Sequence, residues 1–114
     1  MSRRIQRVNQ LIKQEISRII LREIEGPKDT LITVTRVSST SNLKESRVFI
    51  SVIPEENKTK VFLSLNRKIY HLQQEINKRL KMKIVPKIIF VEEKMTASAA
   101  RIEEILEGLK KKEK

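Results

Sequence analysis

Apolar residues return along this chain in two rhythms, one typical of helices and one typical of strands. Between residues 4 and 24 they recur every three or four positions, which places them on one face of a helix. The members of this stripe are Ile5, Val8, Ile12, Ile16, Ile19 and Ile20. Gly26-Pro27 follows, and because glycine caps a helix cheaply and proline cannot continue one, the helix is expected to end there.

Strands are predicted where β-branched residues gather. Residues 31–37 (LITVTRV) and 47–53 (RVFISVI) have this composition, and the polar stretch SSTSNLKES connects them. An antiparallel hairpin with a long turn is the simplest pairing. Residues 83–91 predict a third strand.

The most regular helical pattern spans residues 55–80, where the apolar positions are Phe62, Leu65, Ile69, Leu72, Ile76 and Leu80. A strand, a crossover helix and a further strand form a βαβ unit, so the third strand is expected to run parallel to the second. A short helix is predicted over residues 98–110. The expected fold is therefore α+β, in the order α-β-β-α-β-α, with helices packed on a three-stranded mixed sheet.

The length of 114 residues suits one domain, which we expect over residues 1–109, followed by a short basic tail over residues 110–114. The chain has no cysteine, and no apolar run approaches the roughly 18 residues of a membrane span. We therefore expect a cytoplasmic protein, and a monomer.

The net charge of the chain indicates the class of its partner. Lys and Arg number 25 against 14 Asp and Glu, giving a net charge of +11, and such an excess predicts a polyanionic partner. Seven cations lie between residues 67 and 87, where Glu75 is the one acid. Residues 92–107 hold five acids against two cations, so a second, acidic surface is expected there.

The segment RLKMKIVPKIIF, residues 79–90, has cations at odd positions and apolar residues at even ones. The cations are Arg79, Lys81, Lys83 and Lys87, and the apolar residues are Met82, Ile84, Ile88 and Phe90. In an extended chain, one face would be apolar and the other cationic. Such a face suits phosphates, because each contact releases condensed counterions.

Catalytic chemistry is not indicated. The one histidine, His71, has no nucleophile placed beside it, and with no cysteine the usual zinc ligands are missing. The two glycines, Gly26 and Gly108, cannot build a glycine-rich phosphate loop. The acidic pairs Glu92-Glu93 and Glu103-Glu104 are interpreted as solvated surface. We expect no enzyme, no cofactor and no metal.

Aromatic residues number four, and Phe62 and Phe90 belong to apolar stripes. Too few rings remain for a sheet that stacks unpaired bases, so binding should depend on the backbone and shape of folded, helical RNA.

Several segments, in this order and spacing, resemble the ribosome-binding factor A family. They are Arg7-Val8 with Glu15-Ile16, GPKDTLITVTRV, Asn42-Leu43, RVFISV, RLKMKIVPKIIF and RIEEILEGL at residues 101–109. The resemblance implies a KH type II domain without catalytic activity. It also implies binding to 16S rRNA in the immature, free 30S subunit and assistance in late maturation and rRNA processing, often under cold stress.

The chain departs from the family in two places. The family has an Ala-x-Gly kink inside the long helix, where this chain has Lys68-Ile69-Tyr70, so a contact there would use the side chains of Lys68 and Tyr70. The family's usual glycine before the last helix is Ala99 here.

The hypothesis is an RNA-binding assembly factor whose contacts are Arg3, Arg4, Arg7, Arg67, Lys68, Tyr70, Arg79, Lys81, Lys83 and Lys87. One alternative is a general basic protein that coats DNA or lies on a membrane surface, because the first helix is basic and amphipathic. Another is an adaptor that binds a protein through its acidic C-terminal surface.

Overall fold

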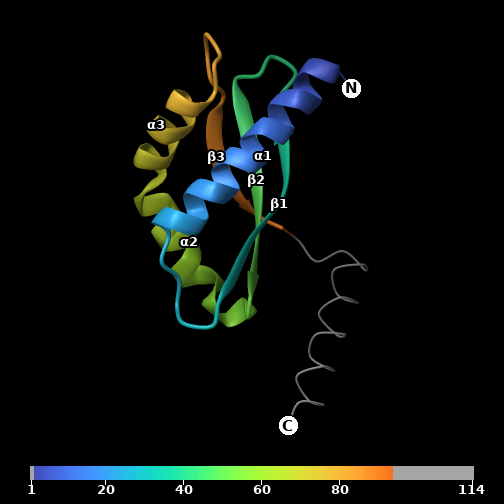
Figure 1. Ribbon diagram of the computed structural model, residues 1–114. Helices are drawn as coiled ribbons and strands as arrows, with labels where there is room; N and C mark the ends of the chain where they lie inside the picture. Colours follow the sequence, from blue (N-terminus) through green and yellow to red (C-terminus); the bar gives the residue numbers. More distant parts are fainter. Residues whose placement is uncertain (1, 94–114) are drawn as a thin grey trace.

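The computed structural model describes residues 2–93 and contains three α-helices, one short 3₁₀ helix and three strands within that range (Figure 1). In chain order they are α1 (Arg3–Glu23), β1 (Leu31–Ser39), β2 (Glu45–Ile53), η1 (Glu55–Asn57), α2 (Lys58–Arg67), α3 (Ile69–Arg79) and β3 (Lys87–Glu92). The helix expected over residues 98–110 and the basic tail over residues 110–114 lie outside the described residues.

The three strands form one sheet in the order β1-β2-β3. β1 pairs antiparallel with β2, and β3 pairs parallel with β2 from Glu45↔Lys87 to Ile50↔Glu92. Both pairings predicted from the sequence are confirmed, and so is the α+β class with a three-stranded mixed sheet. The parallel pairing follows from the helical crossover, which returns β3 to the same end of the sheet as β2.

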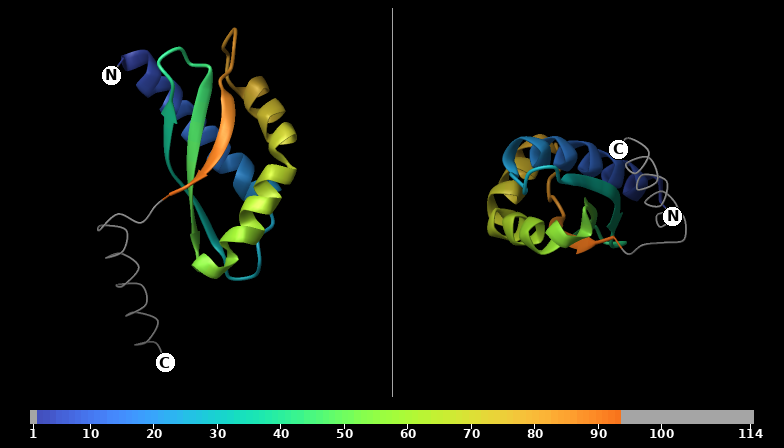
Figure 2. Two further views of the ribbon diagram at one scale, coloured as in Figure 1. Left: turned by 180° about the vertical axis from the view of Figure 1, so that it is seen from behind. Right: turned by 90° about the horizontal axis from the view of Figure 1, so that it is seen from below.

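The helices cover one face of the sheet, and the core lies between them. Seen from behind, the strands lie in front of α1, which crosses the sheet obliquely (Figure 2). Along β2 the alternate residues Val48 and Ile50 are fully buried, whereas Arg47 is exposed. Ile12 and Ile16 of α1 meet this inward face in the same core cluster. The stripe predicted from the sequence is thus the surface that closes the core.

α1 confirms the predicted first helix, with ends shifted by one residue. Its N-cap is Ser2, whose hydroxyl oxygen accepts a hydrogen bond from the Arg4 backbone N–H at 3.2 Å. The helix ends at Glu23, shortly before Gly26-Pro27.

The prediction of one continuous helix over residues 55–80 was wrong, because the helix is broken at Lys68. Lys68 has φ −99° and ψ 7°, outside the helical region, and separates α2 from α3. Its ammonium group donates a hydrogen bond to the backbone carbonyl of Glu23 at the end of α1, at 2.7 Å. Leu65 before the break and Leu72 after it are both fully buried in the core. A kink that the family resemblance implies at this position is therefore present, although Lys68-Ile69-Tyr70 has no small residue.

The prediction of a strand from residue 83 was also wrong. Arg79 is the last residue of α3, residues 80–86 form a loop, and β3 begins at Lys87. Pro86, which is fully buried, has no N–H to donate to a strand ladder, so the ladder begins one residue later with the Lys87 N–H donating to the Lys44 carbonyl at 2.9 Å. The cations at 79, 81 and 83 are therefore not neighbours on one strand face.

Candidate nucleic-acid interface

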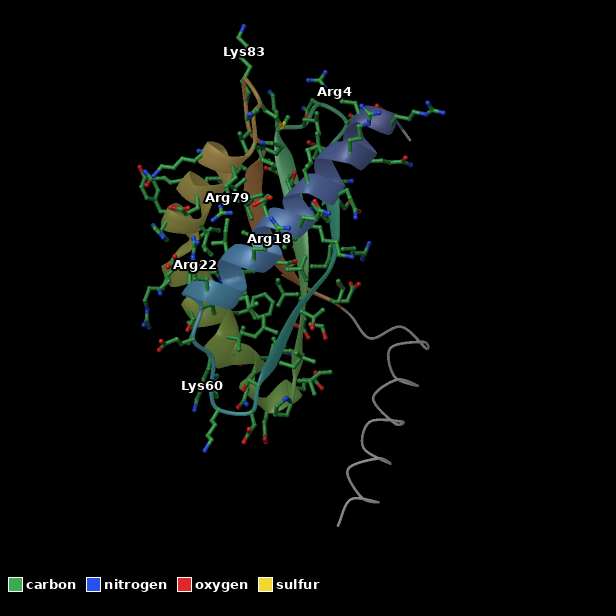
Figure 3. All side chains as sticks on the ribbon, viewed as in Figure 1. Arg4, Arg18, Arg22, Lys60, Arg79 and Lys83 are labelled. Carbon is green, nitrogen blue, oxygen red and sulfur yellow. The ribbon has the colours of Figure 1, made fainter. Side chains whose placement is uncertain are left out.

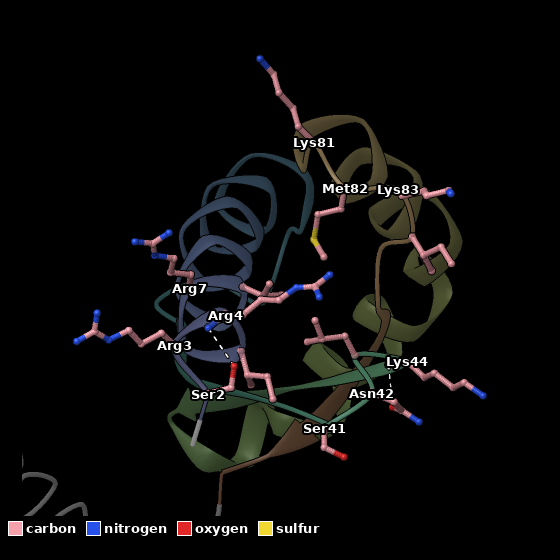
Figure 4. A pocket seen from close by; sticks show the side chains of 14 residues that line it. Ser2, Arg3, Arg4, Arg7, Ser41, Asn42, Lys44, Lys81, Met82 and Lys83 are labelled. Carbon is pink, nitrogen blue, oxygen red and sulfur yellow. Dashed lines mark hydrogen bonds between the residues drawn. The ribbon is translucent and has the colours of Figure 1, made fainter.

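A groove of about 1140 Å³ opens at the end of the molecule where α1 begins (Figure 4). Three segments that are distant in the sequence form it: the first two turns of α1, the turn between β1 and β2, and the loop between α3 and β3. Its lining residues are Ser2, Arg3, Arg4, Ile5, Arg7, Val8, Ser41, Asn42, Leu43, Lys44, Lys81, Met82, Lys83 and Ile84. The fold thus gathers cations from three separate segments of the chain around one hollow.

The turn between β1 and β2 is fixed by its own side chains. The Lys44 N–H donates to the Thr40 hydroxyl at 3.2 Å and to the Asn42 side-chain oxygen at 3.1 Å, as is typical of turns rich in Thr and Asn. Leu43 has φ 56°, in the left-handed region that non-glycine residues seldom adopt. This turn directs the exposed Lys44 side chain to the rim of the groove.

The loop over residues 80–86 separates its apolar and cationic side chains even though it is not a strand. Met82 and Val85 are half-buried and pack against the core, whereas Lys81 and Lys83 are exposed. Figure 4 shows Met82 pointing into the groove, while Lys81 and Lys83 point outward from the loop. The alternation seen in the sequence therefore does present two lysines to solvent, but from a loop.

Six cations and no acid line the groove, and none of the six forms an ion pair within residues 2–93. They are Arg3, Arg4, Arg7, Lys44, Lys81 and Lys83. The first turn of α1 contains no acidic residue, so the positive end of the helix dipole adds to the same potential. Charges placed in this way repel one another, and a bound polyanion would relieve the repulsion.

Two cations outside the groove, Arg79 and Arg36, have carboxylate partners instead. Arg79 donates to Glu15 at 3.0 Å and lies 3.9 Å from Glu75, joining α3 to α1. Arg36 contacts Glu93 at 3.1 Å, and its guanidinium lies 3.7 Å from the centre of the Phe49 ring. Arg36 and Arg79 therefore have carboxylate partners that the six groove cations lack.

The ten residues predicted to contact RNA fall in several places. The structure brings five of them, Arg3, Arg4, Arg7, Lys81 and Lys83, to the groove. Lys87 and the exposed Tyr70 line a smaller hollow of about 400 Å³, which shares Lys44 with the groove.

The other three predicted residues lie apart from the groove. Arg67 and Lys68 line a hollow of about 190 Å³ near the end of α1, together with Glu25. Arg79 is engaged with Glu15 as described above, and its side chain is 30% exposed. Figure 3 shows Arg79 and Arg22 below Lys83, away from the end where Arg4 lies.

Lys44 is the groove residue that sequence reasoning missed. The sequence offered a signal for Lys44. Parallel strands begin at the same end of a sheet, so the loop that leads into the third strand must lie beside the turn that leads into the second. The observed register pairs Glu45 with Lys87 and so brings Lys44 next to the loop. The pairing of strands, rather than local composition, carried this information.

Glu92 and His71 do not line the groove, and each contacts another side chain within residues 2–93. Glu92 accepts a hydrogen bond from the Lys58 ammonium at 2.8 Å, and this bond, with the charges of Glu92 and Glu55, raises the pKa of Lys58 above its ordinary value. His71, half exposed, lies 3.7 Å from Glu23. No group of three His, Cys, Asp or Glu in this part of the chain could hold a metal ion, and no helix in it is long and apolar enough to cross a membrane.

Fold and site together define a small α+β domain that presents a cationic groove among the described residues. The family model "Ribosome-binding factor A" matches residues 4–106, which is nearly the whole chain. The chain therefore belongs to the ribosome-binding factor A family.

Relatives and solved structures agree with this assignment. The chain is 37% identical over 111 residues to ribosome-binding factor A of Carboxydothermus hydrogenoformans, covering 96% of this chain and 89% of that protein. It is 34% identical to the Chlamydia pneumoniae protein of the same name, covering 99% and 97%.

The crystal structure of ribosome-binding factor A from Thermus thermophilus superimposes with a TM-score of 0.64 at 19% identity, covering 77% of this chain and 94% of that one. Coordinates of the T. thermophilus factor fitted into a cryo-EM map of a 30S–RbfA complex give a TM-score of 0.59 at 20% identity, covering 81% and 93%. These likenesses show the fold, which is KH-like as the family resemblance implied.

Proposed function

We propose that this protein is a non-catalytic ribosome-binding factor that acts in the cytoplasm, as a monomer, on the free 30S subunit. It binds 16S rRNA in the immature subunit and assists late maturation, including rRNA processing and growth in the cold. Family membership supports the proposal, as does the 30S–RbfA complex from which the T. thermophilus coordinates derive. No catalytic residue is assigned.

The observation that carries the proposal is the groove with six cations and no acid. Phosphates placed at its rim would replace the condensed counterions of the RNA, and the release of those ions makes binding favourable and strongly dependent on salt. Arg4, Lys44, Lys81 and Lys83 would supply these contacts, and Arg3 and Arg7, whose side chains extend away from the groove, would meet phosphates on the outer side of α1. Lys87 and Tyr70, in the neighbouring hollow, would extend the RNA-binding surface along the edge of the sheet.

Arg67, Lys68 and Arg79 take different roles in this proposal. Arg67 and Lys68 lie near the end of α1, where they would meet a more distant part of the same RNA. Arg79 has two carboxylates within 4 Å and would mainly hold α3, and so the loop that follows it, against α1.

The structure disfavours a membrane role for α1. Ile12, Ile16 and Ile19, which would have to enter the lipid, are 0% exposed because they face the sheet. An interfacial helix needs a free apolar face, and α1 has none over these turns. A protein that coats DNA would sediment with the nucleoid rather than with free 30S particles. The acidic surface of the adaptor alternative consists largely of residues outside the described range.

The proposal is tested by replacing Lys81 and Lys83 together with alanine. We expect weaker binding to purified 30S subunits, and a slope of log K against log salt that is smaller by up to about two units, because two phosphate contacts are lost. Both side chains are exposed, so the fold should be intact by circular dichroism. The matched control is Lys28→Ala with Lys60→Ala, which removes the same charge from exposed positions outside the groove.

Sedimentation of a cell lysate tests the partner directly. The proposal requires the protein to migrate with free 30S particles, and not with membrane, nucleoid or 70S fractions. Unchanged binding of the Lys81/Lys83 variant at moderate salt would show that these lysines are not the contacts. Migration with nucleoid or membrane would support the alternatives instead.

A further inference from the structure

We infer that the groove accepts one unpaired nucleotide of the bound RNA, with its base stacked on the guanidinium of Arg4 and against the apolar side chains of Met82 and Ile84. This inference rests on the proposed function and specifies the class of RNA: a helical RNA that contains a bulged or otherwise unpaired nucleotide. It departs from the expectation that only backbone and shape are recognised.

The lining of the groove is the first argument. Phosphate binding needs only a cationic rim, yet five of the lining residues are apolar. They are Ile5, Val8, Leu43, Met82 and Ile84. Ile84 is 75% exposed, and Met82 is half-buried. A single exposed isoleucine is ordinary, but an apolar wall inside a cationic rim matches a base with its flanking phosphates better than phosphates alone.

The direction of Arg4 is the second argument. Figure 4 shows the Arg4 side chain extending into the groove toward Met82, whereas Arg3 and Arg7 extend away from the groove on the other side of α1. A guanidinium is planar and stacks on nucleobases, which an ammonium group does not do. None of the lining residues is aromatic, so Arg4 offers the one flat side-chain surface that points into the groove.

Size is the third argument. The open volume of about 1140 Å³ exceeds the roughly 300–1,000 Å³ of sites that enclose drug-sized ligands, so it has room for one base with its ribose and the phosphates on either side. A continuous helix, by contrast, presents its bases already stacked and paired. Removing a base from a stack costs least where it is already unpaired, so the groove should select RNA that offers such a base.

The experiment compares two RNA hairpins that differ by one unpaired nucleotide in the stem, measured with the full-length protein by fluorescence anisotropy at several salt concentrations. We expect the bulged hairpin to bind about tenfold more tightly, the gain typical of one base stacked on a side chain. Arg4→Lys keeps the positive charge and replaces the planar guanidinium with an ammonium group, which cannot stack on a base. We expect it to reduce this preference to less than about threefold, with little change in the salt slope for the bulged RNA.

Matched variants separate stacking from general damage. Ile84→Gln should also lower the preference, whereas Leu63→Gln, which alters another exposed apolar residue outside the groove, should not. Arg18→Lys makes the same change as Arg4→Lys at an exposed position on the same helix, and it should leave the preference unaltered. Circular dichroism of each variant shows whether the fold is intact.

Each outcome decides between the two proposals. If both hairpins bind with equal, salt-dependent affinity, the nucleotide site is overturned while the proposed function stands. A preference for the bulge that Arg4→Lys leaves intact would likewise overturn the assignment to this groove. If neither hairpin nor the 30S subunit binds at moderate salt, the proposed function fails and the inference fails with it.

Discussion

Replacing Arg3 and Arg7 with glutamine is expected to stabilise the protein and weaken RNA binding at the same time. Arg3 is the first residue of α1, where the helix dipole is positive, and a cation there costs about 0.3–1 kcal/mol. Arg3 and Arg7 are four residues apart on one helix face, and such like-charge pairs cost about 0.2–0.5 kcal/mol. Glutamine has nearly the helix propensity of arginine, so the variant should gain about 0.5–1.5 kcal/mol.

RNA binding should change in the opposite direction. If each arginine neutralises one phosphate, removing both lowers the slope of log K against log salt by about 1.4–1.8 units. Stability should rise while RNA binding falls, because the two arginines repel each other and the positive end of the helix dipole in the free protein. If the arginines stabilised the fold, their removal would instead lower the free energy of unfolding.

Urea unfolding at low ionic strength measures the stability change, and 30S binding at several salt concentrations measures the slope. The control is Lys60→Gln, which removes a cation from the first turn of α2, at the end of the molecule opposite Arg4 and Lys83 (Figure 3). It should give a stability gain of the same kind but leave RNA binding unchanged. If the Arg3/Arg7 variant is less stable than the wild type, or binds RNA with an unaltered slope, the argument is refuted.

Two further predictions concern ion pairs outside the groove. Arg79→Met removes the contacts with Glu15 and Glu75, which are 19% and 21% exposed, and should cost about 1–2 kcal/mol in urea unfolding. The salt slope of RNA binding should be retained, and a fall of about one unit would instead place a phosphate on Arg79. The raised pKa of Lys58 predicts stability that is complete below its ordinary value of 10.5 and is lost as pH rises through the higher value of the folded state. Melting temperatures between about pH 10 and 12 should therefore fall more steeply for the wild type than for Lys58→Met, and equal slopes would contradict this.

Local signals predicted most elements well. α1 was placed to within one residue because its stripe is uninterrupted and Gly26-Pro27 follows it. The same reasoning could not find the break at Lys68, because the three- and four-residue spacing of apolar positions continues unbroken through Ile69. At the break, Lys68 donates a hydrogen bond to the backbone of Glu23, 45 residues away, and no local pattern could reveal that contact.

The start of β3 shows how a period of two can mislead. Cations and apolar residues alternate from Arg79 onward, but a loop that turns Met82 inward and Lys81 and Lys83 outward produces the same alternation. Pro86 carried the opposing signal, because proline cannot donate to a strand ladder. Arg79 occupies an odd position like the two lysines, so the alternation groups it with them. Its guanidinium nevertheless donates a hydrogen bond to Glu15 of α1.

By itself, the sequence determined the types of element, the excess of positive charge and the scarcity of histidine and cysteine, because each depends on composition or on near neighbours in the chain. The pairing of the strands followed from the order of the elements, because a helical crossover makes the two strands that it joins parallel. The tertiary structure decided which cations act together. Electrostatic repulsion extends over about 10 Å at ordinary salt, a distance set by folding and not by sequence separation. Arg4, Lys44 and Lys83 come from three distant segments and meet at one groove, whereas Arg79, although close to Lys81 in sequence, is neutralised by a glutamate on another helix.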